Sequence, residues 1–127
     1  MAFLKQNPNP KAARVGDCVI RAISIATDKK WEEVYAGLAV TGFSLCDMPS
    51  SNAVWARYLE DNGFEKHIVN NKCPECYTVK DFCIDHPTGA FIIGTGTHAV
   101  AVKDGNYIDT WDSGDEVPIY YFQEERK

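Results

Sequence analysis

The stretch from Val19 to Ala26 is the feature that most constrains the fold of this chain. Six of its eight residues are apolar, and Arg21 is the only charged one. A helix that is apolar on nearly every side must be buried, so we expect this segment to run through the middle of the fold. Gly16, Asp17 and Cys18 come directly before it, where the Gly allows a tight turn and the Asp can cap the helix.

Cys18, at the start of this helix, is a candidate nucleophile. A thiol at a helix N-terminus lies at the positive end of the helix dipole, which favours the thiolate. The negative charge of Asp17 opposes this effect, so a second activating group is needed. The alternative interpretation is a small cysteine packed in a core helix, which is the usual place for a free cysteine.

The composition limits the classes of protein to which the chain can belong. A length of 127 residues is enough for one domain with a core and too short for two, so we expect a single domain over residues 1–127. The net charge of −5 argues against a nucleic-acid partner. No apolar stretch approaches the roughly 18 residues that span a bilayer, and the N-terminus lacks the apolar segment of a signal peptide. We therefore expect a cytoplasmic protein without a membrane partner, and the oligomeric state stays open.

The five cysteines are more typical of thiols or metal ligands than of a disulfide framework, because the sequence shows no export signal. Along the chain, helical patterns come first and strand patterns second. Apolar spacings of three and four predict helices at 19–26, 30–39, 53–61 and 79–85. Short strands are expected at 64–69, 90–93, 98–102, 107–111 and 117–122. This order predicts an α+β fold, in which N-terminal helices are followed by an antiparallel sheet.

His98 begins a strand whose next four residues are all apolar, and two aspartates follow on the other side of a hairpin. The turn at Asp104-Gly105 sets the register of this hairpin. A two-residue turn places Asp109 on the same face as His98, whereas a three-residue loop places Asp112 directly opposite the ring. We prefer Asp112, because at the end of the strand it could turn toward the ring in either register, and we keep Asp109 as the alternative.

Cys18, His98 and one of these aspartates make up the set of groups that nucleophilic thiol catalysis needs. The imidazole takes the thiol proton and later gives it to the leaving group, while the carboxylate orients the ring. An imidazolium beside Cys18 would also offset the field of Asp17. The alternative is a core thiol with an incidental histidine.

The order Cys, His, Asp and the residues around it resemble the papain-like cysteine peptidase superfamily, in particular its small bacterial members that process double-glycine leader peptides. The resemblance covers residues 16–26 and 96–114. The Gly-Asp-Cys motif and the segments 78–82, 85–87 and 109–114 are also similar to a group of small uncharacterised phage and Firmicute proteins. This resemblance implies a papain-like fold and a thiol hydrolase, either a peptidase or amidase or a related acyl transferase. Such an enzyme forms a thioester with a peptide or protein substrate and requires no cofactor.

The resemblance also implies an oxyanion hole. In the family, one donor is the backbone N–H of the nucleophile, here Cys18, and the other is a Gln about six residues before it. That position is Ala12 in this chain. Gln6, Asn7 and Asn9 lie further upstream and could supply the donor if their segment folds over the site. The missing Gln leaves open a catalytically inactive papain-like scaffold that acts as a phage-type protein-binding module.

Cys73, Cys76, Cys83 and His86 form a second cluster, with Cys-x-x-Cys followed by Cys-x-x-His spacing. Four such ligands could hold a structural zinc ion. The alternatives are ordinary thiols, or a redox pair formed by the first two cysteines. A zinc-stabilised interaction domain, in which Cys18 is a core residue, is therefore a third hypothesis.

Overall fold

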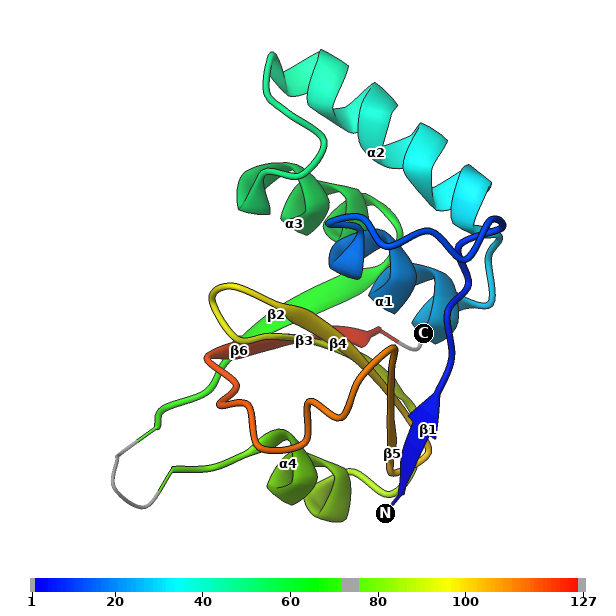
Figure 1. Ribbon diagram of the computed structural model, residues 1–127. Helices are drawn as coiled ribbons and strands as arrows, with labels where there is room; N and C mark the ends of the chain where they lie inside the picture. Colours follow the sequence, from blue (N-terminus) through cyan, green and yellow to red (C-terminus); the bar gives the residue numbers. More distant parts are fainter. Residues whose placement is uncertain (1, 72–75, 126–127) are drawn as a thin grey trace.

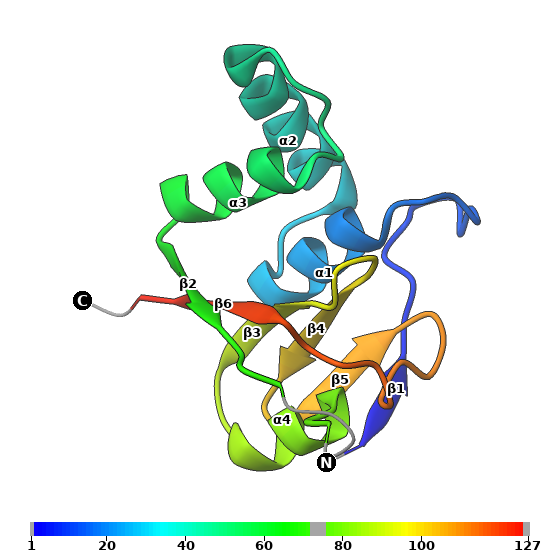
Figure 2. The same ribbon diagram turned by 90° about the vertical axis from the view of Figure 1, so that its left-hand side faces the viewer.

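The computed structural model describes residues 2–71 and 76–125. In these ranges a six-stranded sheet carries helices on both of its faces (Figure 1). Helices α1 (Cys18–Thr27) and α3 (Asn52–Asp61) pack on one face, and α2 (Trp31–Leu45) forms an outer layer against them. The short helix α4 (Val79–Asp85) covers the opposite face (Figure 2). The predicted α+β class is confirmed.

The order of the strands in the sheet is β1-β5-β4-β3-β6-β2. The strands are β1 (Phe3–Lys5), β2 (Phe64–Ile68), β3 (Ala90–Gly94), β4 (Ala99–Lys103), β5 (Asn106–Asp109) and β6 (Tyr120–Glu124). All neighbours are antiparallel except β1, which runs parallel to β5. Since β3 and β4 lie in the centre, helices can cover both of their faces.

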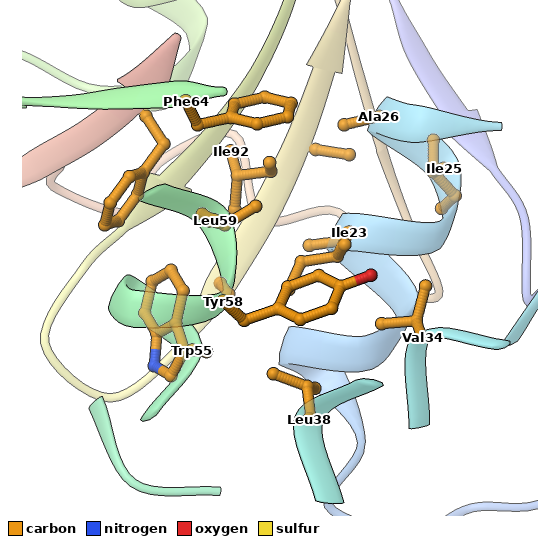
Figure 3. Packing of buried hydrophobic residues seen from close by; sticks show 14 of the residues in the cluster. Ile23, Ile25, Ala26, Val34, Leu38, Trp55, Tyr58, Leu59, Phe64 and Ile92 are labelled. Carbon is orange, nitrogen blue, oxygen red and sulfur yellow. The ribbon is translucent and has the colours of Figure 1, made fainter. Parts of the chain in front are cut away.

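Helix α1 lies in the larger of the two core clusters, as its apolar sequence predicts. Residues 22–26 of this helix are all buried. Figure 3 shows Ile23 packed beside Tyr58 and Leu59 of α3, with Ile92 of β3 close by. Cys18, Val19 and Ile20 at the start of α1 are partly buried against the same cluster, so the packing of the helix positions Cys18.

The residues of β4 are apolar from Ala99 to Val102 because both faces of this strand are covered. Ala99 and Ala101 belong to the cluster that contains α1, whereas Val100 and Val102 belong to the cluster that contains α4. The two alanines have small side chains, and α1 packs directly on this strand. This packing brings the start of α1 near His98, the residue before β4.

The prediction of an antiparallel sheet was wrong at one edge. Residues near the N-terminus form β1, which adds to β5 in parallel with Phe3 opposite Tyr107. The rings of these two residues stack with centroids 5.4 Å apart. A strand of three residues is too short to show a periodic pattern, so its pairing depends on a contact distant in sequence. The sheet is therefore mixed.

Helix α2 continues to Leu45, beyond its predicted end at residue 39. Gly42 lies inside the helix. The chain that follows the helix folds back against this glycine. A Cβ atom at Gly42 would lie 2.8 Å from the carbonyl oxygen of Asp47. The glycine thus serves a close backbone approach. Cys46, in the left-handed region at φ 55°, follows the last helical residue.

The two C-terminal strands are displaced from their predicted positions. β5 ends at Asp109, although the prediction extended to residue 111, and β6 begins at Tyr120, although the prediction began at 117. Pro118 has no N–H to donate to a sheet, which is consistent with the later start of β6. Within the described ranges, no helix has both the length and the apolar character needed to cross a membrane.

Candidate functional site

Three separate elements bring Cys18, His98 and Asp109 together. Cys18 is the first residue of α1, His98 directly precedes β4, and Asp109 is the last residue of β5. Cys18 and His98 both line a cavity of about 420 Å³. The site therefore lies where the N-terminal end of α1 meets one end of the sheet.

A chain of hydrogen bonds connects the three side chains. The Cys18 thiol is hydrogen-bonded to the His98 ring, and the backbone N–H of Ala99 also contacts the sulfur. The Nε2 atom of His98 lies 2.6 Å from Oδ2 of Asp109. Since Nε2 faces the carboxylate, Nδ1 is the ring nitrogen left for Cys18. This arrangement fixes the roles of the two ring nitrogens.

Asp109 is held by further hydrogen bonds. The hydroxyl of Ser113 donates to Oδ2 at 2.8 Å, and the backbone N–H of Thr110 donates to Oδ1 at 2.7 Å. The residue is only 3% exposed. Because its oxygens accept from three sides, the carboxylate is fixed in a position that orients the imidazole.

The electrostatics of the site favour a thiolate beside an imidazolium. Burial acts to raise the pKa of Cys18, but the hydrogen bonds from His98 and from the Ala99 N–H outweigh it, and the pKa is lowered. Burial acts to lower the pKa of His98, but its hydrogen bonds with Asp109 and Cys18 raise the pKa to about 9. The pKa of Asp109 is lowered because the hydrogen bonds from His98 and Ser113 outweigh the effect of burial.

The preferred partner of His98, Asp112, is not the one that contacts the ring. The hairpin has the register of the two-residue turn, with Ala101 opposite Ile108, and this register puts Asp109 on the side of His98. The Asp112 carboxylate instead accepts a hydrogen bond from the Tyr107 hydroxyl at 2.7 Å. It also accepts one from the backbone N–H of Gly114 at 3.1 Å. Asp112 is thus an element of the loop after β5.

We expect Asp109→Asn to slow the alkylation of Cys18 at pH 6.5 about tenfold, and Asp112→Asn to change the rate by less than about twofold. The amide of Asn carries no charge, so the His98 imidazolium loses its partner and stabilises the Cys18 thiolate less. A rise of one unit in the pKa of Cys18 lowers the fraction of thiolate about tenfold. Iodoacetamide labelling with peptide mass mapping measures the rate. An equal loss in both variants would contradict the assignment of Asp109.

The expected penalty from Asp17 is offset by a buried cation. The Asp17 side chain does not cap α1. Its Oδ1 pairs with Arg21 instead, and its Oδ2 accepts from Trp31 Nε1 at 3.0 Å and from the Asn9 side-chain amide at 3.2 Å. Arg21 also approaches Asp109, with Nη2 3.7 Å from Oδ1. The guanidinium therefore lies between two buried carboxylates, and its charge contributes to lowering the pKa of Cys18.

The three upstream amides proposed for the oxyanion hole do not line the cavity that contains Cys18. Gln6 and Asn7 line a second, neighbouring cavity of about 850 Å³. The Asn9 side-chain amide donates to Asp17, and its Oδ1 accepts from the backbone N–H of Lys11 at 2.9 Å. The backbone N–H of Cys18 remains available as a donor, since the first N–H groups of a helix have no acceptor within the helix.

Asn52 is an amide side chain that does line the cavity of Cys18. The indole N–H of Trp55 donates to its Oδ1 at 2.9 Å, which leaves the donating Nδ2 group outside this hydrogen bond. Asn52 comes from the start of α3, and nothing in the local sequence indicates that this helix end lies near Cys18.

The proposed zinc cluster falls partly outside the described residues, because Cys73 lies in the segment 72–75. Cys83 is buried inside α4 at 1% exposure. His86 donates from Nδ1 to the carbonyl oxygen of Phe82 at 2.9 Å and stacks on the Phe82 ring at 3.8 Å. Among residues 2–71 and 76–125, no three His, Cys, Asp or Glu side chains are grouped so that they could hold a metal ion. Cys76 is disulfide-bonded, and a zinc ligand must be a free thiolate, so the four-ligand set would require reduction of this bond and stays a prediction.

Two positioning residues were missed by the sequence interpretation. Arg21 follows Asp17 by four residues, which is the spacing of an ion pair on a helix, and this signal could have identified the contact. The hydrogen bond from Ser113 to Asp109 depends on the shape of the loop after β5, so no local pattern indicates it. No protein-family model, curated protein or solved structure matches the chain, so the chemistry of the site has to be argued from its own geometry.

Proposed function

We propose that this chain is a papain-like thiol hydrolase that cleaves an amide bond in a peptide or protein. Cys18 is the nucleophile, His98 is the base and Asp109 orients the ring. The observation that carries this proposal is the chain of hydrogen bonds from Cys18 through His98 to Asp109, with Nε2 and Oδ2 at 2.6 Å. Such a chain supplies both the reactive thiolate and the proton that the leaving amine needs.

The reaction follows from the positions of these groups. The Cys18 sulfur attacks the carbonyl carbon, and the backbone N–H of Cys18 donates to the developing oxyanion. The carbon–nitrogen bond breaks, and the protonated His98 gives its Nδ1 proton to the departing amine. A water molecule then attacks the thioester while His98 takes one of its protons, and the carbon–sulfur bond breaks to release the acid. If an amine replaces the water, the same steps transfer the acyl group.

A second candidate function is a catalytically inactive papain-like scaffold that binds a protein. The observation that favours it concerns the oxyanion hole, since Gln6, Asn7 and Asn9 are all turned to other partners or to another cavity. The Cys18 N–H and the Asn52 amide are candidate donors from residues that do line the cavity. The hydrolase requires a thiolate–imidazolium pair between Cys18 and His98, whereas the binding scaffold does not.

The reactivity of Cys18 compared with that of Cys46 tests the proposal within one protein. Cys46 is an exposed free thiol in the loop after α2, and it serves as an internal standard. We expect iodoacetamide at pH 6.5 to label Cys18 at least about tenfold faster than Cys46, because an ordinary thiol with a pKa of about 8.5 is about 1% ionised at this pH. Peptide mass mapping separates the two sites.

Two results would contradict the thiol hydrolase. The first is a Cys18 that reacts no faster than Cys46 below pH 7, because the thiolate would then be absent. The second is a Cys18→Ala protein that keeps a hydrolytic activity found in the parent, because the nucleophile would then be another group. The first result would favour the binding scaffold, and the second would move the nucleophile away from Cys18.

A further inference from the structure

Two cavities of different chemistry meet at the residues just before Cys18 in the chain. They share Val15 and Gly16 as a common wall, directly before the nucleophile. The cavity of about 420 Å³ that contains Cys18 is called the apolar cavity here, because of the side chains of Val19, Ile20, Trp31, Leu38, Trp55 and Tyr120. The neighbouring cavity of about 850 Å³ is called the basic cavity, because its charged side chains are Lys5, Arg14 and Arg21.

Arg21 of the basic cavity is paired with Asp17 and Asp109, but the charges of Lys5 and Arg14 are not neutralised by any described residue. None of its lining residues is acidic. Arg21 is paired with Asp17, but its buried Nε–H has no hydrogen-bond partner in the described part of the chain. Lys5 and Arg14 form no ion pair with any described residue. In a chain with a net charge of −5, this local excess of cations selects an anionic group.

Trp111 connects the basic cavity to the chemistry. Its indole lines this cavity, and its ring lies against His98 with centroids 4.9 Å apart. His98 is the group that must protonate the departing amine. Trp111 therefore links His98, which lines the apolar cavity with Cys18, to the basic cavity.

We propose that the substrate of this site is an amide with a bulky apolar acyl group and with an acidic group on the amine that is released. The inference rests on the proposed thiol hydrolase and adds the substrate class to it. The apolar cavity has the size and the aromatic side chains of a pocket that holds an apolar group. Lys5 and Arg14 bind the acidic group. The substrate is thereby oriented with its acyl group in the apolar cavity and its amine side toward the basic cavity.

Protection of Cys18 against iodoacetamide at pH 6.5 tests the inference with three small amides. N-(3-phenylpropanoyl)-glutamic acid α-amide carries both features, and the corresponding glutamine compound differs only by a carboxamide in place of the carboxylate. N-acetyl-glutamic acid α-amide lacks the apolar group. We expect the first compound to protect at a concentration about fivefold lower than the glutamine compound, which is the effect of a partly exposed charge pair. We expect the acetyl compound to require at least about tenfold more than the first, since it buries no phenyl group.

Variants locate the anion. In the double variant Lys5→Gln and Arg14→Gln, we expect the preference for the glutamic acid compound to disappear. The matched control is Arg57→Gln, which removes an exposed arginine that pairs with Asp61 on α3, and which should retain the preference.

The outcomes separate the two proposals. If Cys18 reacts rapidly at pH 6.5 but the glutamic acid and glutamine compounds protect equally, the substrate inference is wrong and the thiol hydrolase stands. A preference that persists without Lys5 and Arg14 would place the anion elsewhere and would also overturn the inference. If Cys18 reacts no faster than Cys46, both proposals fall.

Discussion

Replacement of His98 by Ala is expected to slow the alkylation of Cys18 at pH 6.5 by up to about a hundredfold. Burial raises the pKa of Cys18, and the interactions with His98 are the main effect that lowers it. Without the imidazolium, this pKa therefore returns toward or above its ordinary range. A thiol with a pKa of about 8.5 is about 1% ionised at pH 6.5, which sets the size of the loss. The measurement is the rate of iodoacetamide labelling of Cys18 between pH 5 and 10, resolved by peptide mass mapping.

The direction of the pH dependence follows from the two pKa shifts. The pKa of His98 is raised from 6.5 to about 9, so its contribution to folding stability is complete below pH 6.5 and is lost as the pH rises through about 9. The pKa of Cys18 is lowered, so its thiolate persists to a lower pH than an ordinary thiolate. We therefore expect the parent to begin labelling at a lower pH than the variant, which labels only as the pH rises through the ordinary range for a thiol. Cys46 in the same protein is the control, and an unchanged profile for Cys18 in the variant would refute the ion pair.

Arg21→Met is expected to lower the free energy of unfolding by about 3–5 kcal/mol. The side chain of Arg21 is 11% exposed, and the Asp17 and Asp109 side chains that it contacts are each 3% exposed. Methionine fills much of the same space but removes the charge, so two buried carboxylates lose their cation. Breaking a buried ion pair from one side costs about this amount, because the remaining charge stays desolvated. Urea denaturation at pH 7, followed by tryptophan fluorescence, measures the change.

The comparison variant is Arg57→Met. Arg57 pairs with Asp61 four residues later on α3, but both side chains are more than half exposed. Removing an exposed pair of this kind costs at most about 1 kcal/mol. If the two variants lose similar stability, then the ion pairs of Arg21 do not support the site as described.

The features that could be predicted from the sequence are those with a local cause. The buried helix from Cys18 follows from its largely apolar sequence, and the Thr78 capping box with Asp81 is present as its spacing indicates. The strand after His98 is buried on both faces, as four apolar residues in succession predict. Each of these patterns is decided within a few residues of the chain.

The features that could not be predicted depend on contacts between distant segments. The choice between Asp109 and Asp112 required the register of a hairpin, and one extra residue in the turn would have reversed it. The strand β1 has three residues and exists because β5 offers it a free edge. Asn52 reaches the cavity of Cys18 only through the way α3 packs, so no spacing in the sequence connects the two residues.

Cys18 and His98 stand 80 positions apart in the chain, and the packing of α1 on β4 alone joins them. The low-pH reactivity of the thiol is therefore a property of the folded molecule, since an unfolded chain holds the two residues too far apart to share a proton. The fraction of Cys18 that is labelled rapidly at pH 6.5 then measures the fraction of native molecules in a mixture. A solution in which half of the molecules are unfolded would show half of the rapid labelling, whichever part of the structure had failed.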